Sequence, residues 1–227
     1  MLSQPVNEEG LTGLGRALGR LAPDGVQTDV RAISPVWIEH LAPQEREIAA
    51  SFADQRRAEF ASGRASLRCA IGGLLPDEFP ILVGERRAPV LPPGIIGSVT
   101  HTGSVVAAIA SNSQVLLGLG VDIEIGKRVT PDLGDAVLSA PEKVALSGRR
   151  ASPPLANFFS AKEASFKAIH GLINRYIDFT DLALSFEADG FLAEPLFSAS
   201  GLRNVIIEGR CAQYADYVAT IAWAKSA

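Results

Sequence analysis

Helix-like segments followed by strand-like segments occur twice along this chain of 227 residues. Residues 43–72 have no internal proline and repeat large apolar side chains at near-helical intervals, which predicts one long or broken helix. Leucines at helical spacing predict a shorter helix at 11–21. A stretch rich in proline and glycine, 79–103, is predicted as a loop that leads into a buried strand at "VVAAIAS", residues 105–111. This order of elements favours an α+β fold.

The second half repeats the order without a low-complexity linker. After a short polar turn comes "QVLLGLGVDIEI", residues 114–125, whose Val, Leu and Ile content predicts a strand of a mostly buried sheet. We therefore expect a hairpin within residues 104–125. Ser139 stands three residues before Glu142, which is typical of a capping box that starts a helix. Alternating apolar and polar residues over 179–225 predict a closing antiparallel meander.

The composition limits the classes of partner. Hydrophobic residues make up 47% of the chain and charged residues 20%, which is enough apolar material for one core or for two smaller ones. The net charge is −4 and the sequence pI is about 5.4. We therefore expect no general attraction to nucleic acid or to an anionic membrane, and any anion-binding site must be local.

Cysteine use and the pattern of apolar runs indicate the compartment. Cys69 and Cys211 are too few and too far apart for a disulfide framework or a zinc cluster, so buried reduced thiols are expected. The start of the chain has no basic residue before its first apolar run, and no run of about 18 apolar residues occurs. We expect neither a signal peptide nor a membrane span, and we predict a cytoplasmic protein.

The segment "GVDIE", residues 120–124, places two carboxylates on one face of a strand. Residues i and i+2 of a strand point to the same side, so Asp122 and Glu124 project together. Such a pair suits a hard divalent cation such as Mg²⁺, and an ordinary exposed strand face is the alternative interpretation. The overlapping "GLG" resembles the start of a dinucleotide fingerprint. We reject that function, because the third glycine is missing and no helix signal follows directly.

The segment "FFSAKEASFKAIH", residues 158–170, carries charges within an otherwise apolar or small run. In a helix, Glu163 and Lys167 share a face at i and i+4, whereas Lys162 points about 100° away from Glu163. A surface ion pair is one interpretation. The other is a partly buried functional site in which Glu163 joins the acidic pair of 120–124 at a metal. The residues by themselves leave both open.

Histidine and arginine side chains offer an anion site in the first half. His101 lies in "GSVTHTG" next to Thr100, and a hydroxyl with an imidazole can complete an anion cradle, although a structural histidine is the alternative. Guanidinium groups suit bidentate contact with phosphate, although a solvated helix face is the usual setting of such charges. The arginines are Arg56, Arg57, Arg64, Arg68, Arg86 and Arg87, of which Arg57, Arg64 and Arg68 share one helical face.

In this order, the motifs resemble the phosphopantetheinyl transferase superfamily, in particular its Sfp-like branch of the enterobactin synthetase component D type. The central motifs are "GSVTHTG", "GVDIE" and "FSAKEASFKA". The segments "RRAEFASGR", "APVLPPGIIGS" and "YIDFTDLALSF" extend the resemblance over residues 55–185. Each motif alone is weak, and the ordered set is specific.

The resemblance implies a role for each charged residue of the two acidic motifs. Asp122, Glu124 and Glu163 would hold Mg²⁺, with Mn²⁺ as a substitute, against the pyrophosphate of coenzyme A. Lys167 would contact the phosphate that is transferred, and Lys162 would be a second basic contact. Glu163 would also accept the proton of the attacking serine, either directly or through a metal-bound water.

The resemblance also implies contacts with the other phosphates of coenzyme A. Thr100 and His101 would form a phosphate-binding pair, with His101 at the 3′-phosphate. Arg64 and Arg56 would serve coenzyme A phosphates as well, and the match to Arg56 conflicts with the helical-face spacing, which favours Arg57.

The chain departs from the family pattern in the loop before its proline-rich segment. Relatives often have a lysine where Val83 stands here. Arg86 or Arg87 would take over the contact of that lysine with coenzyme A, and we assign Arg86 to the site.

For the fold, the resemblance implies two similar, pseudo-symmetric subdomains, 1–112 and 113–227, each a small antiparallel sheet packed with a long helix, with coenzyme A in the crevice between them. The implied reaction moves 4′-phosphopantetheine from coenzyme A to a serine of an apo acyl or peptidyl carrier protein and releases adenosine 3′,5′-bisphosphate. Such carriers serve fatty-acid, polyketide, nonribosomal-peptide and siderophore synthesis, and we expect a monomer. Two other classes stay open: a non-catalytic module that binds coenzyme A or a carrier, and a Mg²⁺-dependent pyrophosphate hydrolase.

Overall fold

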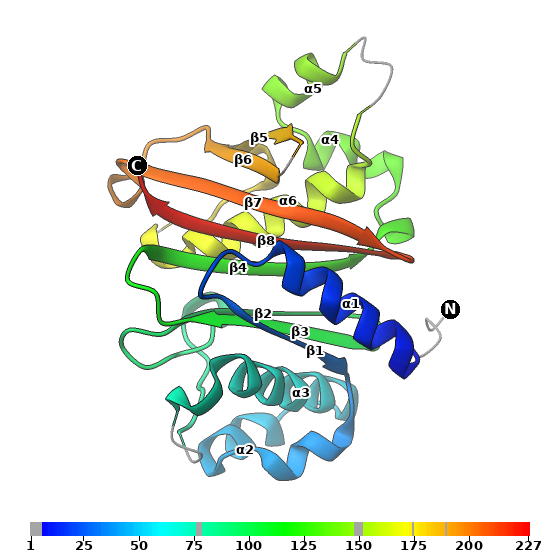
Figure 1. Cartoon of the computed structure of the whole chain (residues 1–227), viewed down its shortest axis with the longest axis vertical. Helices are drawn as coiled ribbons and strands as arrows, with labels where there is room; N and C mark the ends of the chain where they lie inside the picture. Colours follow the sequence, from blue (N-terminus) through cyan, green and yellow to red (C-terminus); the bar gives the residue numbers. More distant parts are fainter. Residues whose placement is uncertain (1–5, 76–78, 148–151, 174, 189) are drawn as a thin grey trace. The chain divides into compact units, whose positions relative to one another are not determined.

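Two antiparallel sheets, each packed with a long helix, make up most of the described chain in the computed structural model (Figure 1). The chain divides into two compact units, Met1–Gln114 and Val115–Ala227, and the sequence analysis places this boundary between 112 and 113. Both units combine helices with antiparallel strands, so the predicted α+β class is confirmed. The structure describes residues 6–75, 79–147, 152–173, 175–188 and 190–227.

The first unit contains two predicted helical regions, and both are confirmed. The region predicted over 43–72 is broken into two helices, because the guanidinium of Arg57 caps the break by donating to the carbonyl oxygens of Ala49 and Phe52 at 3.1 and 2.9 Å. The elements are α1 (Glu8–Leu21), β1 (Gln27–Ala32), α2 (Pro43–Ala50), α3 (Asp54–Ile71), β2 (Ile96–Thr102) and β3 (Val105–Ser111), with 3₁₀ turns at Pro35–His40, Gly72–Leu74 and Glu85–Arg87.

Strand β3 is the centre of the first sheet, whose order is β1-β3-β2 with antiparallel neighbours. The hairpin predicted within 104–125 is wrong, because β1 and β2 occupy both edges of β3. The hairpin is formed instead by β2 and β3, with Gly103 at φ 57° in its turn, a left-handed conformation that glycine adopts without strain. Strand β2 therefore lies within the stretch 79–103 that was predicted as a loop.

Helices α1 and α3 lie on opposite faces of β1. Ser66 of α3 donates to Asp29 Oδ2 at 2.6 Å, whereas Gly15 of α1 faces Val30. Asp29 and Val30 are consecutive residues of a strand and therefore point to opposite sides of the sheet. Helix α3 contacts all three strands of the sheet. Apolar packing of its C-terminal half, through Leu67, Ala70 and Ile71, anchors the helix and thereby positions its charged N-terminal half.

The second unit places helix α6 on a five-stranded sheet of order β4-β8-β7-β6-β5. The predicted closing meander is confirmed, because β5, β6, β7 and β8 are consecutive antiparallel neighbours. The elements are β4 (Leu116–Ile125), α4 (Gly134–Val137), α5 (Ala140–Leu146), α6 (Leu155–Ile169), β5 (Leu182–Glu187), β6 (Gly190–Pro195), β7 (Val205–Tyr214) and β8 (Tyr217–Ser226), with 3₁₀ turns at Gly126–Arg128, Pro131–Leu133, His170–Leu172, Phe179–Asp181 and Ser200–Leu202.

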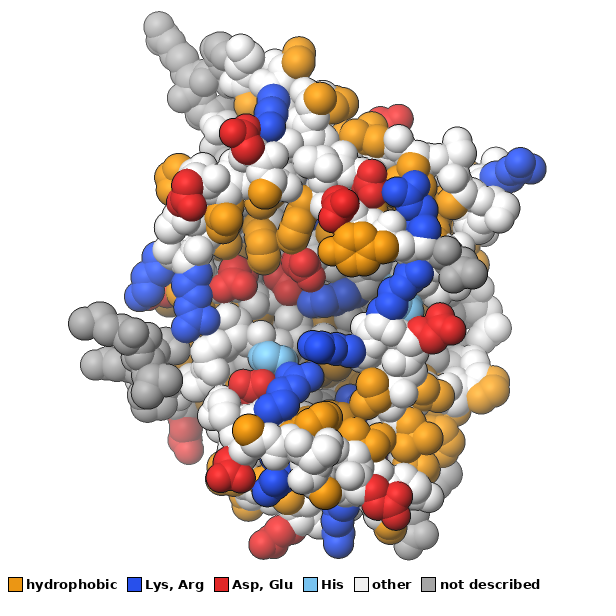
Figure 2. Space-filling view, turned by 180° about the vertical axis from the view of Figure 1, so that it is seen from behind, with side chains coloured by type: hydrophobic (Ala, Val, Ile, Leu, Met, Phe, Trp, Pro, Cys, Tyr) orange, Lys and Arg blue, Asp and Glu red, His pale blue; other side chains and the backbone are white. Residues whose placement is uncertain are grey.

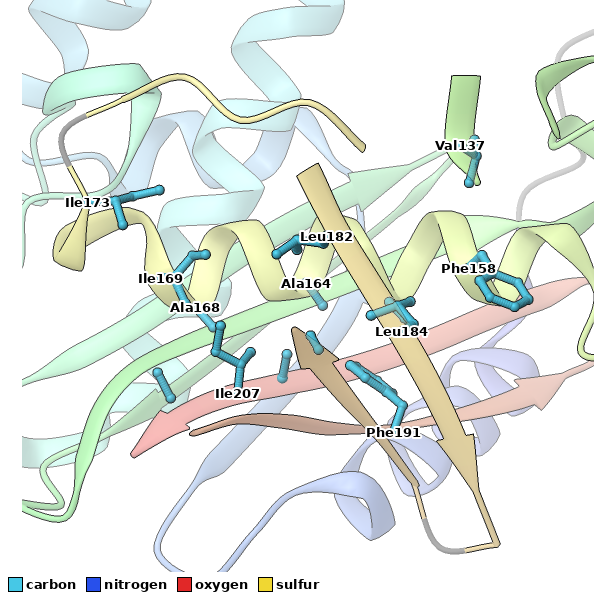
Figure 3. Packing of buried hydrophobic residues seen from close by; sticks show 14 residues of the cluster. Val137, Phe158, Ala164, Ala168, Ile169, Ile173, Leu182, Leu184, Phe191 and Ile207 are labelled. Atoms are coloured by element: carbon cyan, nitrogen blue, oxygen red, sulfur yellow. The ribbon is translucent and has the colours of Figure 1, made fainter. Parts of the chain in front are cut away.

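The core of the second unit lies between α6 and the sheet (Figure 3). Phe158 and Ile169, at opposite ends of α6, are both buried in it, together with Leu184 and Phe191 of the neighbouring strands. Burying each such side chain contributes about 1.5–3 kcal/mol. The helix that carries the predicted charges is thus anchored to the sheet along its length.

The exposure of the two cysteines differs from the expectation that both thiols are buried. Cys69 is exposed and Cys211 is partly buried, so the prediction of buried thiols is wrong for Cys69. Figure 2 shows acidic and basic side chains interspersed over the face in view, in keeping with the small net charge. Within the described ranges, no helix is both long and apolar enough to cross a membrane.

Candidate active site

Two glycines bring helix α6 close to strand β4. Gly118 and Gly120 face the helix, and a Cβ on either would overlap the carbonyl oxygen of Ala168 or Ala164. Because side chains alternate along a strand, the acidic pair of β4 continues this same face. Because Gly118 and Gly120 have no Cβ, α6 can pack directly on β4 and lie close to the two carboxylates.

Lys167 joins the helix to the strand. Its Nζ donates to Asp122 Oδ1 and to the carbonyl oxygen of Val121, each at 3.0 Å. Asp122 is only 6% exposed, so this ion pair is largely withdrawn from water. Glu124 Oε1 accepts the backbone N–H of Ile125 at 2.6 Å. The structure places Lys167 and Asp122, two of the predicted site residues, in direct contact.

Glu163 lies one turn before Lys167 on the same helix. Burial raises the pKa of its carboxyl above the usual range, the Lys167 ammonium opposes this rise, and the charges of Asp122 and Glu124 add to it. Both carboxylates of β4 therefore act on Glu163 electrostatically. A carboxylate with a raised pKa is a better proton acceptor for a hydroxyl group than an ordinary glutamate.

The chemistry of this acidic group fits a hard divalent cation, although its side chains do not converge. Mg²⁺ prefers one or two carboxylates plus water and phosphate oxygens, and a cation would offset the repulsion by Asp122 and Glu124 that adds to the effect of burial on the pKa of Glu163. Within the described part of the chain, no three acidic, histidine or cysteine side chains meet in a metal-holding geometry. Lys167 instead pairs with Asp122, while Glu124 bonds its own backbone.

Lys162 is excluded from this group by burial. Its side chain is 0% exposed, and its Nζ donates to Glu142 Oε2 at 2.6 Å and to the carbonyl oxygens of Val137 and Phe179 at 2.8 Å each. An ammonium has three N–H donors, and all three are used. The structure therefore contradicts the predicted contact of Lys162 with coenzyme A, because this face of α6 points into the protein interior.

In the first unit, the structure brings Arg56 and His101 together. Arg56 Nη1 lies 2.9 Å from His101 Nε2; a guanidinium only donates, so this nitrogen accepts and the ring proton belongs on Nδ1. Glu59 accepts from the same Nη1 at 3.2 Å and lies 3.8 Å from the imidazole. Arg57, which the helical spacing favours, is occupied by backbone carbonyls. These contacts favour Arg56 as the partner of His101.

Two other predicted residues point elsewhere. Thr100 precedes His101 on β2, so its side chain lies on the opposite face of the sheet, where it is 8% exposed. Arg64 is 5% exposed, and its Nε and Nη2 donate to the carbonyl oxygens of Ile81 and Leu82 at 2.6 and 3.2 Å. The side chains of Thr100 and His101 therefore lie on opposite faces of β2, and the guanidinium of Arg64 is committed to backbone carbonyl groups.

Arg86 and Arg87 occupy the exposed tip of the loop that precedes β2. Their backbones have φ of 50° and 66°, in the left-handed region that residues with a side chain rarely adopt. Val83, where relatives often have lysine, forms a bridge with Pro89 at the base of this loop. Arg86 and Arg87 are therefore the cationic side chains that this loop tip exposes, whereas Val83 lies at the loop base and offers no charge.

Sequence reasoning missed several residues that support the site. In sequence, the glycines of "GLGVDIE" resemble a nucleotide fingerprint, whereas in the structure Gly118 and Gly120 allow the close approach of α6. Glu59 stands at i+3 from Arg56, a spacing that was available as a signal. Thr220 and Ser160 form a fully buried hydroxyl pair behind the acidic group, and no local pattern identifies such a contact.

Comparison with known proteins identifies the family. Residues 44–111 match the family described as the 4′-phosphopantetheinyl transferase N-terminal domain, and residues 118–222 match the 4′-phosphopantetheinyl transferase superfamily. The 4′-phosphopantetheinyl transferase Npt of Nocardia iowensis is 30% identical over 148 residues, which cover 65% of this chain and 67% of that protein. The transferase Svp of Streptomyces mobaraensis is 34% identical over 154 residues, 66% of this chain and 62% of Svp.

Two further similarities concern a curated relative and a solved structure. Enterobactin synthase component D of Salmonella typhi is 31% identical over 118 residues, 50% of this chain and 48% of that protein. Among solved structures, Thermotoga maritima holo-[acyl-carrier-protein] synthase gives a TM-score of 0.41 at 19% identity, covering 49% of this chain and 65% of that one. The matches to Npt and Svp span about two thirds of each relative's own length. The family that the ordered motifs predict is confirmed: this chain belongs to the 4′-phosphopantetheinyl transferase superfamily.

Proposed function

We propose that this chain transfers 4′-phosphopantetheine from coenzyme A to a serine of an apo carrier protein and releases adenosine 3′,5′-bisphosphate. The observation that carries the proposal is the meeting of Lys167 with Asp122 beside Glu163, at positions that match the family motifs. The similarity to enterobactin synthase component D supports a carrier of siderophore synthesis as the substrate.

Asp122, Glu124 and Glu163 would hold Mg²⁺, or Mn²⁺, which supplies positive charge to the pyrophosphate when it is bound. Glu163 accepts the proton of the carrier serine, a role that suits its raised pKa. Lys167, which pairs with Asp122 in this structure, would contact the departing phosphate through its ammonium group. A base and a cationic group one turn apart on a buried helix keep their spacing without further support.

Arg56 and His101 would bind the phosphate at the nucleotide end of coenzyme A. The pair lies within hydrogen-bonding distance, both side chains are 41% exposed, and the guanidinium suits bidentate contact with phosphate. Arg86, at the tip of its loop, is proposed as a second cation for the same ligand.

Mass spectrometry of an apo carrier protein after incubation with the chain, coenzyme A and Mg²⁺ tests the proposal. A mass gain equal to one phosphopantetheine group, lost when Glu163 is changed to Gln, is the expected result. Release of phosphopantetheine without carrier modification indicates a pyrophosphate hydrolase instead, and unchanged coenzyme A indicates a binding module. Normal turnover by Glu163→Gln would remove this residue from the mechanism.

A further inference from the structure

The segment at the base of the arginine loop is held to helices α2 and α3 by charged side chains. Arg68 Nη2 donates to the carbonyl oxygen of Phe79 at 2.8 Å, and Glu45 Oε1 accepts the N–H of Ile81 at 2.8 Å. Arg64 donates to the carbonyl oxygens of Ile81 and Leu82. Three charged groups thus bind the backbone at residues 79, 81 and 82, and Ile81 is held through both its N–H and its carbonyl oxygen.

Two of these charges, Glu45 and Arg64, are buried, whereas the Arg68 side chain is 21% exposed. Glu45 is 0% exposed, and its carboxylate also accepts from Arg68 Nη2 at 2.8 Å and from the N–H of Ala42 at 2.9 Å. Burial lowers the pKa of Arg64 to about 10, which still leaves its guanidinium charged at neutral pH. Buried charges of this kind are costly, and apolar residues of similar volume would often serve stability as well or better. Stability alone is therefore a weak reason to have them here.

The clamped segment leads directly into the loop that presents Arg86. Hydrogen bonds from Val90 N to Leu82 O at 3.0 Å and from Gly84 N to Ala88 O at 2.8 Å close the loop. Its tip holds two consecutive left-handed residues, and such a strained backbone persists only where its surroundings fix it. The carbonyl oxygen of Leu82 accepts both from Arg64 and from the N–H of Val90. The buried charges therefore fix the position of the residue at which the strained loop begins.

We propose that Glu45 and Arg64 are positioning residues for coenzyme A binding: they hold the loop base at Ile81 and Leu82 so that Arg86 is presented to the ligand in one orientation. The inference rests on the proposed function in that it takes coenzyme A as the ligand of Arg86. It gives Arg64 a role behind the loop in place of the direct phosphate contact that the family resemblance implies. Ordering the loop before binding lowers the entropy cost that the ligand must otherwise meet.

The second unit supplies a matched control. Glu142, on short helix α5, repeats the pattern of Glu45: its carboxylate accepts the N–H of Ser139 at 2.6 Å, a cation of the long helix at Lys162, and the N–H of Leu184 at 2.8 Å. Glu142 is also buried, at 3% exposed. Its distal contact holds a strand of the second sheet and not the arginine loop. The two glutamates therefore share a structural role and differ in what they position.

The test measures the affinity for coenzyme A by calorimetry in Glu45→Gln, Arg64→Lys, Arg86→Ala, Glu142→Gln and the double variant Glu45→Gln/Arg86→Ala, with thermal unfolding of each. We expect Glu45→Gln and Glu142→Gln to lower Tm similarly, and only Glu45→Gln to weaken binding, by about tenfold. Arg64→Lys, which keeps the charge and is the variant of choice should Glu45→Gln not fold, should weaken binding in the same way. In the Arg86→Ala background, Glu45→Gln should add less than about twofold, because the side chain that it positions is gone.

Equal loss of affinity in Glu45→Gln and Glu142→Gln, or a full additional loss on top of Arg86→Ala, overturns the inference. Unchanged binding in Arg86→Ala overturns it as well, because no ligand contact would then depend on the loop. The calorimetric measurement needs no transfer reaction, so a chain that shows the expected pattern but modifies no carrier contradicts the proposed function alone.

Discussion

Thr220 of β8 lies directly opposite Asp122 of β4, and its hydroxyl is 2.9 Å from the hydroxyl of Ser160 on α6. Both hydroxyl-bearing residues are 0% exposed. Opposed residues on neighbouring strands point to the same face of a sheet, so this pair lies beside the aspartate that Lys167 contacts. The acidic group is thus backed by a polar contact within an otherwise apolar interface between helix and sheet.

Thr220→Val should destabilise the protein by about 1–2 kcal/mol, because the buried Ser160 hydroxyl loses its partner while the volume is retained. Chemical denaturation measures the loss. Adding Ser160→Ala should recover part of it, since both polar groups are then gone. Thr130→Val, at an exposed threonine, is the control and should be neutral within about 0.5 kcal/mol. Equal effects of the two threonine variants would contradict a role for the buried pair.

Gly120→Ala should destabilise the second unit by at least about 1–3 kcal/mol and abolish transfer, because the new Cβ meets the backbone of α6 and not a flexible side chain. Gly134→Ala is the matched control, since nothing lies within 4 Å of a Cβ there and its φ of −53° suits alanine. Thermal unfolding and the carrier assay distinguish them. A fully active Gly120→Ala protein would show that α6 need not approach β4 so closely.

Glu163→Gln should raise the stability of the metal-free protein at neutral pH, because the ionised carboxylate is disfavoured in the fold. The pKa of Glu163 in the folded chain is raised, chiefly by burial. Below the usual carboxyl range, Glu163 is protonated in both the folded and the unfolded chain, so Glu163→Gln gains no stability there. The gain should appear as the pH rises through that range and be complete above the raised pKa. Tm measured across pH checks this, with the exposed Glu194→Gln as control. A gain that is largest at acid pH would refute the assigned cause.

Lys162→Met should cost about 3–5 kcal/mol, because Glu142 is then left charged and unpaired in the interior. Lys143→Met removes an exposed ion pair with Asp135 and should leave the free energy of unfolding almost unchanged, because water screens such a pair. Denaturant titration compares the two. If Lys162→Met instead folds with normal stability and binds coenzyme A poorly, the structural role assigned to this lysine is wrong.

The elements around the site could be predicted because their signals are local. A strand of Val and Ile with carboxylates at i and i+2 places Asp122 and Glu124 on one face whatever surrounds it, and helical spacing does the same for Glu163 and Lys167. The order of these motifs along the chain was enough to predict the family. Strand pairing is not decided locally. The sequence places β3 and β4 next to each other and so predicts a hairpin, but in the structure the two edges of β3 pair with β1 and β2, which both precede it in the chain.

Only the tertiary structure decides which charges face a ligand and which face the interior. Lys162 and Lys167 lie on one helix among similar neighbours, yet the first is saturated by three internal acceptors and the second reaches the acidic strand. Arg64 is likewise committed to carbonyl groups of a distant loop. Spacing along a helix determines which side chains share a face. Which face becomes buried depends on the apolar surface and hydrogen-bond acceptors that remote segments bring to it, and these exist only once the chain has folded.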